Sequence, residues 1–283
     1  MEFMLITVVP EIALEVEAAG VSRIFVDMET MGKPQRQANA NTPIYSHSFE
    51  DVSSLKKTLK KAEVMLRINP LHSGTQEEID RAIDAGADCI MFPYFTSENE
   101  VQEFIRLVDS RVRTNILFET SQAVGRANQI FRVGGFDEVH FGLNDLRLTL
   151  GLDFLFESVA GGLIDWLCSL AQSAGVSYGF GGVGRVGKEM LSAELILKEH
   201  IRLGSERVIL SRVFHGEAKN LGELREYVDL KEEVEKVREV IRLAKDRSPD
   251  EIESDSLEFQ AAVRKIAQMI SEKARGERKV GNL

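Results

Sequence analysis

The feature that most constrains the fold of this chain is a regular alternation of short apolar runs with longer amphipathic segments. The apolar runs are rich in β-branched and aromatic residues and cover residues 3–9, 23–29, 63–69, 88–94, 114–120, 138–142, 176–182 and 207–214. Most of them are too short and too continuous to be helices, so they are interpreted as strands. Helical patterns lie between them, for example over residues 10–20, 50–62, 75–86, 97–108 and 188–204. Ser97 and Thr75 are expected to be N-caps, each with a Glu three residues later (Glu100 and Glu78) as in a capping box.

Strands that are separated by helices pair in parallel through crossover connections. Eight such repeats over about 245 residues favour a closed barrel, because an open doubly wound sheet usually has about five or six strands. The length of 283 residues would by itself also allow two domains. We therefore predict an α/β fold, a (β/α)8 TIM barrel formed by residues 1–246, with an extra C-terminal helix.

The C-terminal part departs from the repeat. A charged helix is expected from about residue 220 to 246, followed by an acidic linker that contains Pro and Ser and by a last helix. In that last helix Phe259, Val263, Ile266 and Ile270 recur at helical spacing and form one apolar stripe. We expect residues 247–283 to be a linker and a helical arm, whose stripe packs either on its own barrel or on a neighbouring subunit.

The acidic balance of the chain narrows its possible partners. With 45 Asp and Glu against 35 Lys and Arg, the formal charge is −10, which leaves no electrostatic footprint for nucleic acid or an anionic membrane. Cys89 and Cys168 lie in apolar runs without metal-ligand spacing, as is typical of reduced packing residues. Neither a signal peptide nor an apolar stretch of about 20 residues is visible. We expect a cytoplasmic protein whose partner is a small molecule.

Polar residues at the ends of strands are the best candidates for function, because barrel enzymes work at the C-terminal ends of their strands. Several of the expected strands end in, or run into, such residues: Asp27 and Glu29, Arg67 and Asn69, Glu119, and Asn144 with Asp145. Period-two alternation places the first two on one face of their strand, and Arg67 and Asn69 on one face of theirs. We therefore expect four carboxylates and one arginine to meet at the same rim.

Buried ionised groups need partners, so this convergence has two explanations. In the first, Arg67 forms a structural salt-bridge network with Asp27 or Glu119. In the second, Glu119 and Asp145 hold a divalent cation, with Arg67 beside it to bind a substrate carboxylate. Two carboxylates completed by water and substrate oxygens suit Mg2+, and Mn2+ also accepts oxygen ligands.

Four segments resemble the HpcH/HpaI aldolase and citrate lyase β-subunit superfamily: VDMET (26–30), LRINPLHSGTQEEIDRAIDAGADCIMFPYFTSENEV (66–101), ILFETSQAVGRANQI (116–130) and GLNDLRLTLG (142–151). The resemblance implies a TIM barrel, often with a C-terminal helix exchanged between subunits and hence a homo-oligomer. It also implies that Glu119 and Asp145 are metal ligands and that Arg67 binds enolate or carboxylate oxygens. The substrate carboxylate is then expected at the backbone N–H groups of Leu143, Asn144 and Asp145, since a helix N-terminus receives an anion well.

The activity implied by this resemblance is metal-dependent carbon–carbon cleavage of the aldolase type, through the enolate of a 2-oxo acid such as pyruvate or oxaloacetate. One departure matters: Thr30 stands where the aldolase branch has a histidine, which acts with an aspartate of a neighbouring subunit. Asp84 matches that aspartate, but without the histidine the pair is not carried over to this chain. The Asp27-x-Glu29 string is closer to the citrate lyase branch, so cleavage of an acyl-CoA such as citryl-CoA or malyl-CoA is an alternative. A barrel that binds a metabolite without turnover is a third interpretation.

Other groups have to move the proton if the histidine is missing. His47 and His72 follow the second and third strands, at the catalytic end of the barrel, and are the candidates. His140 lies within a strand and is expected to be a satisfied interior residue. Lys33 and Arg36 are expected either to bind the distal part of the substrate or to lie in a solvated loop.

Residues 179–184 match the pattern G-x-G-x-x-G. The match is weak as a dinucleotide fingerprint, because it does not follow a first strand. Loops after the seventh and eighth strands of barrels often bind phosphate, which makes Gly182 a candidate for binding a phosphorylated or CoA-bearing substrate. A tight turn that lets Arg185 cap the rim is the other explanation.

Overall fold

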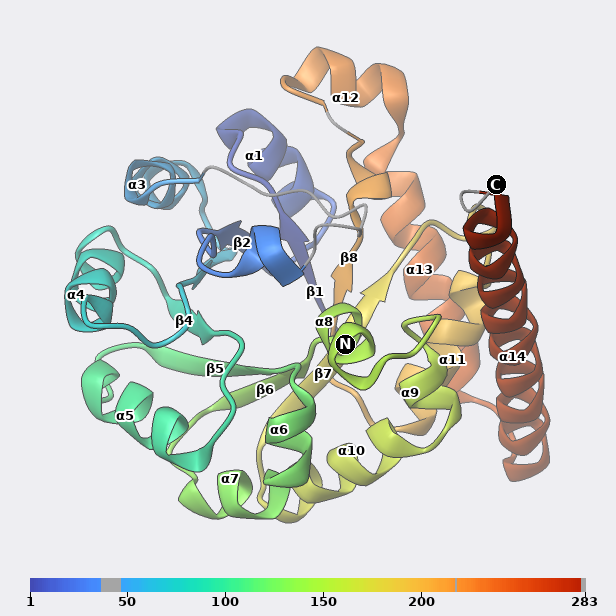
Figure 1. Ribbon diagram of the computed structural model, residues 1–283. Helices are drawn as coiled ribbons and strands as arrows, with labels where there is room; N and C mark the ends of the chain where they lie inside the picture. The colour runs from blue at the N-terminus through green and yellow to red at the C-terminus, as the bar shows by residue number, and fades with distance from the viewer. Residues whose placement is uncertain (37–46, 217, 281–283) are drawn as a thin grey trace.

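The computed structural model describes residues 1–36, 47–216 and 218–280. Eight parallel strands close into a barrel in the order β1 to β8, and helices form a ring around it (Figure 1). The strands are β1 (Glu2–Ile6), β2 (Arg23–Asp27), β3 (Glu63–Arg67), β4 (Cys89–Phe92), β5 (Arg113–Phe118), β6 (Glu138–Phe141), β7 (Ser177–Val183) and β8 (Arg207–Leu210). The predicted (β/α)8 barrel is therefore confirmed.

The helices cover the outer face of the barrel or follow the carboxyl ends of the strands. They are α1 (Pro10–Ala18), α2 (Lys33–Arg36), α3 (Phe49–Thr58), α4 (Thr75–Asp84), α5 (Glu98–Val108), α6 (Ser121–Gly125), α7 (Ala127–Val133), α8 (Leu143–Leu150), α9 (Glu157–Ala160), α10 (Leu163–Ser173), α11 (Ala193–Arg202), the 3-10 turn η1 (Arg212–Phe214), α12 (Leu221–Tyr227), α13 (Leu230–Lys245) and α14 (Pro249–Val280). Within the described residues, no helix is both long and apolar enough to cross a membrane.

The barrel interior is built in layers, as the inward-facing residues of β2 illustrate. Arg23, Phe25 and Asp27 are each at most 1% exposed. Phe25 belongs to an apolar layer that also contains Met4, Met65, Cys89, Met91 and Leu117. Arg23 lies on one side of this layer, paired with Glu138, whereas Asp27 lies on the other side at the carboxyl ends of the strands. The apolar layer therefore separates the polar mouth of the barrel from the buried charges at its opposite end.

Local capping explains where several helices begin. At α5, the Ser97 hydroxyl accepts from the Glu100 N–H and the Glu100 carboxylate accepts from the Ser97 N–H, which is the capping box expected from the sequence. The expected N-cap at Thr75 is wrong by one residue. Gly74 occupies that position, and the Thr75 hydroxyl instead accepts a hydrogen bond from the His72 N–H at 2.8 Å.

The C-terminal region differs from the expected single helix and linker. The charged segment is two helices, because the chain is extended at Val228 and Asp229 then caps α13 by accepting from the Glu232 N–H. The segment expected to be a linker is mostly helical, since a capping arrangement between Ser248 and Glu251 starts α14 at Pro249. The final three residues lie outside the described part of the chain.

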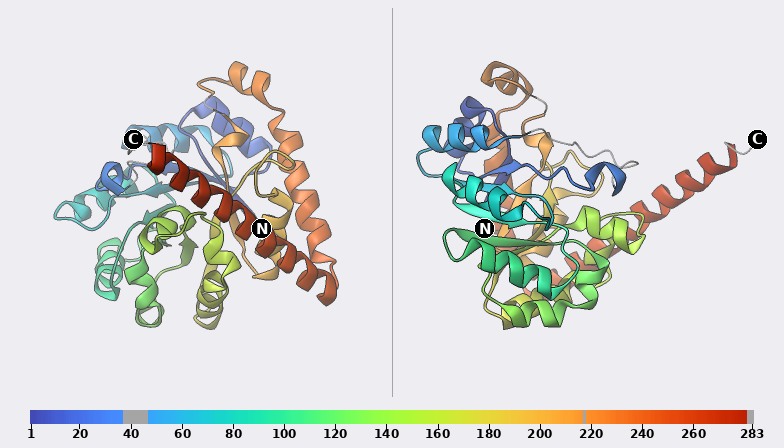
Figure 2. Two further views of the ribbon diagram at one scale, coloured as in Figure 1. Left: turned by 45° about the vertical axis from the view of Figure 1, so that its right-hand side comes forward. Right: turned by 60° about the vertical axis from the view of Figure 1, so that its left-hand side comes forward.

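The apolar stripe of α14 packs on its own barrel. Phe259 and Val263 are fully buried, and the Phe259 ring meets Phe156 edge-on at 6.1 Å between centroids. The helix runs along α11 and α9, and an ion pair between Lys198 and Asp255 at 2.7 Å ties it to α11. Figure 2 shows that its C-terminal turns continue past the body of the barrel.

We propose that these projecting turns take part in self-association of the chain. Truncation after Ser271 leaves the buried residues Phe259, Val263 and Ile266 in place, so the barrel is expected to keep its thermal midpoint. We expect light scattering to give an oligomeric mass for the full chain and a lower mass for the truncated one. If truncation leaves the oligomeric state unchanged, this contradicts the proposal that the C-terminal turns of α14 join subunits.

Candidate active site

Asp27, at the end of β2, is held by two cations. Its carboxylate accepts from the Arg67 guanidinium at 2.8 and 2.7 Å and from the Lys33 ammonium at 2.6 Å. Burial alone would raise the pKa of Asp27, but the charges of Arg67 and Lys33 outweigh it and hold the pKa below its ordinary value. The salt bridge between Arg67 and Asp27, one of the two expected arrangements, is therefore present.

Arg36, from the short helix α2, bridges two strand ends. It donates to the carboxylate of Glu29, and its Nε donates to Oδ2 of Asp145 at 3.0 Å. Its guanidinium also lies over the ring of Tyr94, 4.1 Å from the centroid. Lys33 is only 3% exposed, so these two side chains lie within the site and not in a solvated loop.

Glu119 and Asp145 are the two carboxylates expected to hold a metal. Both are buried, and Oε1 of Glu119 accepts a hydrogen bond from the Tyr94 N–H at 3.1 Å. Gly142 leaves room for this carboxylate, because a Cβ atom there would lie 2.7 Å from Oε2 of Glu119. Burial, followed by the negative charges of Asp145 and Glu29, raises the pKa of Glu119 well above its ordinary value.

The donor chemistry of this pair fits a hard divalent cation. Within the described ranges, no group of three or more His, Cys, Asp or Glu side chains is arranged around a metal position. Mg2+, however, commonly takes one or two protein carboxylates and completes its shell with water and substrate oxygens. Glu119 and Asp145 supply such a pair, and a cation held by them would offset the charge repulsion that, after burial, raises the pKa of Glu119. One of the Asp145 oxygens, Oδ2, also accepts the hydrogen bond from Arg36.

The N-terminus of α8 opens beside these carboxylates. Gly142 is its N-cap, and no described side chain caps the first turn. Leu143, Asn144 and Asp145, the first residues of α8, all line the same cavity. Gly181 makes room for this turn, because a Cβ atom there would approach Cδ1 of Leu143 to 2.7 Å. The structure therefore brings the expected carboxylate-binding turn next to the expected metal ligands.

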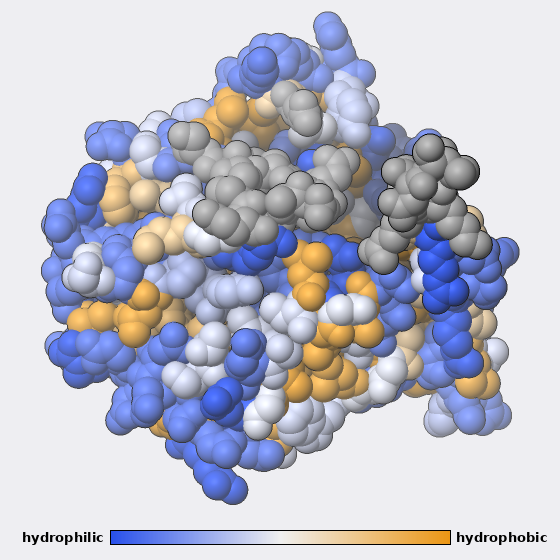
Figure 3. Space-filling view, in the orientation of Figure 1, coloured by the Kyte–Doolittle hydropathy of each residue, from blue (hydrophilic) through white to orange (hydrophobic). Residues whose placement is uncertain are grey.

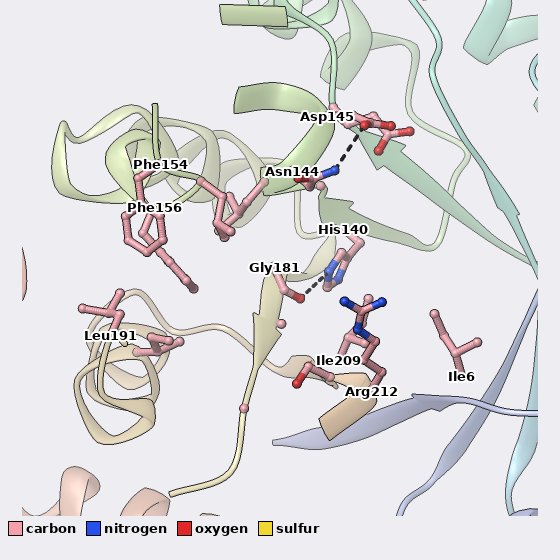
Figure 4. A pocket seen from close by; sticks show the side chains of 18 of the residues that line it. Ile6, His140, Asn144, Asp145, Phe154, Phe156, Gly181, Leu191, Ile209 and Arg212 are labelled. Carbon is pink, nitrogen blue, oxygen red and sulfur yellow. Dashed lines mark hydrogen bonds between the residues drawn. The ribbon is translucent and has the colours of Figure 1, made fainter. Parts of the chain in front are cut away.

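These groups surround one cavity of about 570 Å³ at the mouth of the barrel. Its polar lining includes Asp27, Arg67, Glu119 and Asp145, and Gly182 also faces it. Figure 4 shows Asn144 and Asp145 on one side of the cavity and Phe154, Phe156 and Leu191 on the other.

The two histidines expected to move a proton occupy different surroundings. His47 is half-buried, and its Nδ1 accepts the Asp27 N–H at 3.0 Å, which places the ring beside the site. Burial lowers the pKa of His47 more than the charge of Asp27 raises it. His72 instead pairs with Glu78 at 3.1 Å and does not line the cavity.

Thr30 and Asp84, the two residues at which the chain was compared with the aldolase branch, also lie outside the cavity. The Thr30 N–H donates to the Asn69 side chain at 2.9 Å, so Asn69 braces the loop after β2 instead of facing the substrate. Asp84 ends α4 on the outside of the barrel, where it lines a shallow surface hollow with Lys57 and Arg81. The structure therefore does not bring Asp84 to the site of this chain.

His140 is an interior residue, as expected, but it is not fully satisfied. Its Nε2 lies 3.0 Å from the Gly181 carbonyl, while its buried Nδ1 finds no hydrogen-bond partner among the described residues. It lines the cavity, and burial lowers its pKa to about 4. At neutral pH the ring is therefore uncharged.

The glycines of residues 179–184 serve close packing. Gly179, Gly181 and Gly182 lie within β7 itself and not in a loop after it. A Cβ atom at Gly179 would collide with the backbone of Arg207 on β8. Arg185 stacks over the ring of Tyr227, 5.0 Å from its centroid, while Gly182 and Gly184 line the cavity.

Sequence reasoning missed two residues of the site. Tyr94 follows β4, where a positive φ of 52° lets its N–H reach Glu119 while its ring supports Arg36. Arg212 follows β8 and lines the cavity beside His140 (Figure 4). Both positions lie at strand ends, so the rule that selected the other candidates would have found them.

Comparison with solved structures supports the architecture. An HpcH/HpaI aldolase from Desulfitobacterium hafniense DCB-2 is similar, with 17% identity, a TM-score of 0.60 and coverage of 88% of this chain and 94% of that chain. A citrate lyase from Burkholderia xenovorans LB400 has 13% identity and a TM-score of 0.57, with coverage of 99% and 92%. At these identities the likeness establishes the fold alone. Among curated proteins, none matches the chain significantly.

A family model gives the assignment that the structures alone do not. The model of the HpcH/HpaI aldolase/citrate lyase family matches residues 7–156, just over half of the chain. The matched part includes Asp27, Arg67, Glu119 and Asp145, which the barrel brings to one cavity. The chain belongs to the HpcH/HpaI aldolase/citrate lyase family.

Proposed function

We propose that this protein is a divalent-metal-dependent carbon–carbon lyase of the aldolase type, which acts on a 2-oxo acid such as pyruvate or oxaloacetate. The observation that carries the proposal is the pair of buried carboxylates, Glu119 and Asp145, beside Arg67 and the N-terminus of α8 at one cavity. An anionic substrate needs such local groups, because the chain as a whole is acidic.

In this proposal each group has a separate task. The first turn of α8 receives the substrate carboxylate, since Leu143, Asn144 and Asp145 at this helix end line the cavity. Mg2+ or Mn2+, held by Glu119 and Asp145, would supply Lewis-acid polarisation of the 2-oxo group. Arg67 stabilises negative charge that develops on the substrate oxygen, and its two bonds to Asp27 fix its orientation.

His47 is the histidine that suits proton transfer in this proposal. Its Nδ1 accepts the Asp27 N–H, so the neutral ring carries its proton on Nε2 and would serve as a proton donor, although His47, like His72, does not line the cavity. His72 is engaged with Glu78 away from the cavity and has no assigned role.

Decarboxylation of oxaloacetate tests whether the site is catalytic. We expect the protein with Mg2+ to decarboxylate oxaloacetate faster than Mg2+ alone, and chelation by EDTA to remove the activity. Arg67→Ala is expected to lower the rate by about 10²-fold or more, because a charge-stabilising donor is lost. Arg106→Ala, which removes an exposed arginine of α5, is the control and should keep the wild-type rate. A wild-type rate no higher than that of Mg2+ alone would contradict the lyase proposal and favour a non-catalytic barrel.

A further inference from the structure

The cavity at the mouth of the barrel continues beyond the charged groups along an apolar wall. Three elements from different parts of the sequence build this wall: Phe154, Leu155, Phe156, Leu191, Ile196 and Ile270. The first three lie between α8 and α9, the next two lie at or just before α11, and the last comes from α14. In Figure 4 the aromatic rings and Leu191 lie across the cavity from Asn144 and Asp145.

Part of this wall is open to solvent. Phe154, Leu155 and Ile270 are half-buried, and the neighbouring Met190, which also lines the cavity, is 70% exposed. Figure 3 shows apolar residues gathered on the same face of the molecule, over the region of α8 and α9. Solvent-exposed apolar surface that lines a cleft is typical of a ligand-binding site.

The volume of the cavity also indicates a ligand that reaches the apolar wall. A volume of about 570 Å³ lies in the range of roughly 300–1,000 Å³ that suits ligands much larger than a three-carbon acid. The charged groups occupy one end, where in the proposed function the N-terminus of α8 receives the substrate carboxylate. A substrate that stopped at this end would leave the wall of Phe154 and Leu191 without contact.

We infer that the substrate is amphipathic: a 2-oxo acid whose far end is an uncharged, unbranched hydrocarbon chain that lies on this wall. The inference rests on the proposed function, because it takes the orientation of the acid end from that site. A chain on the wall gains about 0.8 kcal/mol for each buried methylene, which corresponds to about fourfold in affinity. A second carboxylate at that end would lie against the apolar side chains of Phe156 and Leu191, next to the like-charged Glu189.

The experiment measures binding instead of turnover. Pyruvate, 2-oxopentanoate and 2-oxoheptanoate are titrated calorimetrically into the full-length protein with Mg2+ present. We expect affinity to rise about fourfold per added methylene while the chain still lies on the wall. Affinity that stays constant or falls with chain length, or binding by no member of the series, would overturn the inference.

Matched substitutions locate the effect. Ile270→Asp places a charge on the wall and is expected to abolish the increase in affinity with the chain length of the ligand. Met269→Asp, at the next position of α14, is the control: Met269 is 53% exposed and does not line the cavity, so the gain should remain. Met190→Asp provides a second test at a side chain too exposed to affect folding. A gain that survives both Ile270→Asp and Met190→Asp would overturn the inference.

The outcome also separates this inference from the lyase proposal. Affinity that rises with chain length, with no catalysed decarboxylation of oxaloacetate, would keep the apolar subsite and reject the lyase. Decarboxylation together with length-independent binding would keep the lyase and reject the apolar subsite.

Discussion

Replacing Glu119 with glutamine is expected to abolish metal-dependent turnover of oxaloacetate, with a loss of about 10³-fold or more. The exchange removes one of the two carboxylates proposed to hold the cation. Glutamine has nearly the same size and keeps an oxygen that accepts the Tyr94 N–H, so the geometry around Gly142 is preserved. Steady-state decarboxylation with Mg2+ in excess measures the effect.

A stability measurement shows that the loss is not caused by unfolding. Burial and the charges of Asp145 and Glu29 disfavour the ionised form of Glu119, so a neutral glutamine removes an unfavourable buried charge. We expect Glu119→Gln without metal to melt no earlier than the wild type. The same exchange at Glu103, an exposed residue of α5, should leave both activity and the melting temperature unchanged. Full activity in Glu119→Gln would remove this carboxylate from the mechanism.

Replacing Glu138 with glutamine is expected to cause the largest loss of stability, about 3–5 kcal/mol. Glu138 lies in the barrel interior at the end opposite the cavity, where it accepts from Arg23 at 2.7 and 2.9 Å and from Asn115 at 3.0 Å. Arg207 adds a second cation, 3.3 Å away. Without the carboxylate, Arg23 and Arg207 are left buried without this counter-charge. For a chain of this size we expect a fall in thermal midpoint of about 10 °C.

The pH dependence identifies the cause of that loss. Although burial alone would raise it, the pKa of Glu138 is held at about 2, mainly by Arg23 and Arg207, below its ordinary value of 4.5. A lowered pKa contributes stability that is present above 4.5 and is lost as the pH falls towards 2. The difference in unfolding free energy between the wild type and Glu138→Gln should therefore shrink over this range. A difference that is independent of pH would indicate packing instead of charge.

The architecture could be predicted because each strand and most helices carry their own periodic signal. The apolar runs that contain Val64, Ile116 and Val139 are short and β-rich, and their repetition leaves few alternatives to a barrel. The same regularity placed Asp27 and Glu119 at one rim, because every parallel strand ends on the same side. Breaks within charged segments were harder to place, since Asp229 and Ser248 act as caps in a region where many charged residues suit a continuous helix or a linker.

The electrostatic structure of the site could not be predicted in the same way. Periodicity does not say which way a loop turns, so the sequence left Lys33 and Arg36 open between the substrate and solvent. In the structure both side chains turn inward, so that Lys33, Arg36 and Arg67 together face the four carboxylates. The wall that contains Ile270 could not be predicted either, because it depends on how α14 packs against residues 154–156 and 191–196, which are distant in the sequence. Contacts of this kind come from packing and not from local pattern.

The central claim is that Glu119 and Asp145 hold a divalent cation at the mouth of the barrel. Titration with Mn2+ followed by electron paramagnetic resonance tests it directly, because free and bound Mn2+ give different signals. The wild type is expected to bind Mn2+ in competition with Mg2+, and Glu119→Gln and Asp145→Asn are expected to lose this binding while Glu103→Gln retains it. Equal Mn2+ binding by the wild type and both site variants would contradict the account.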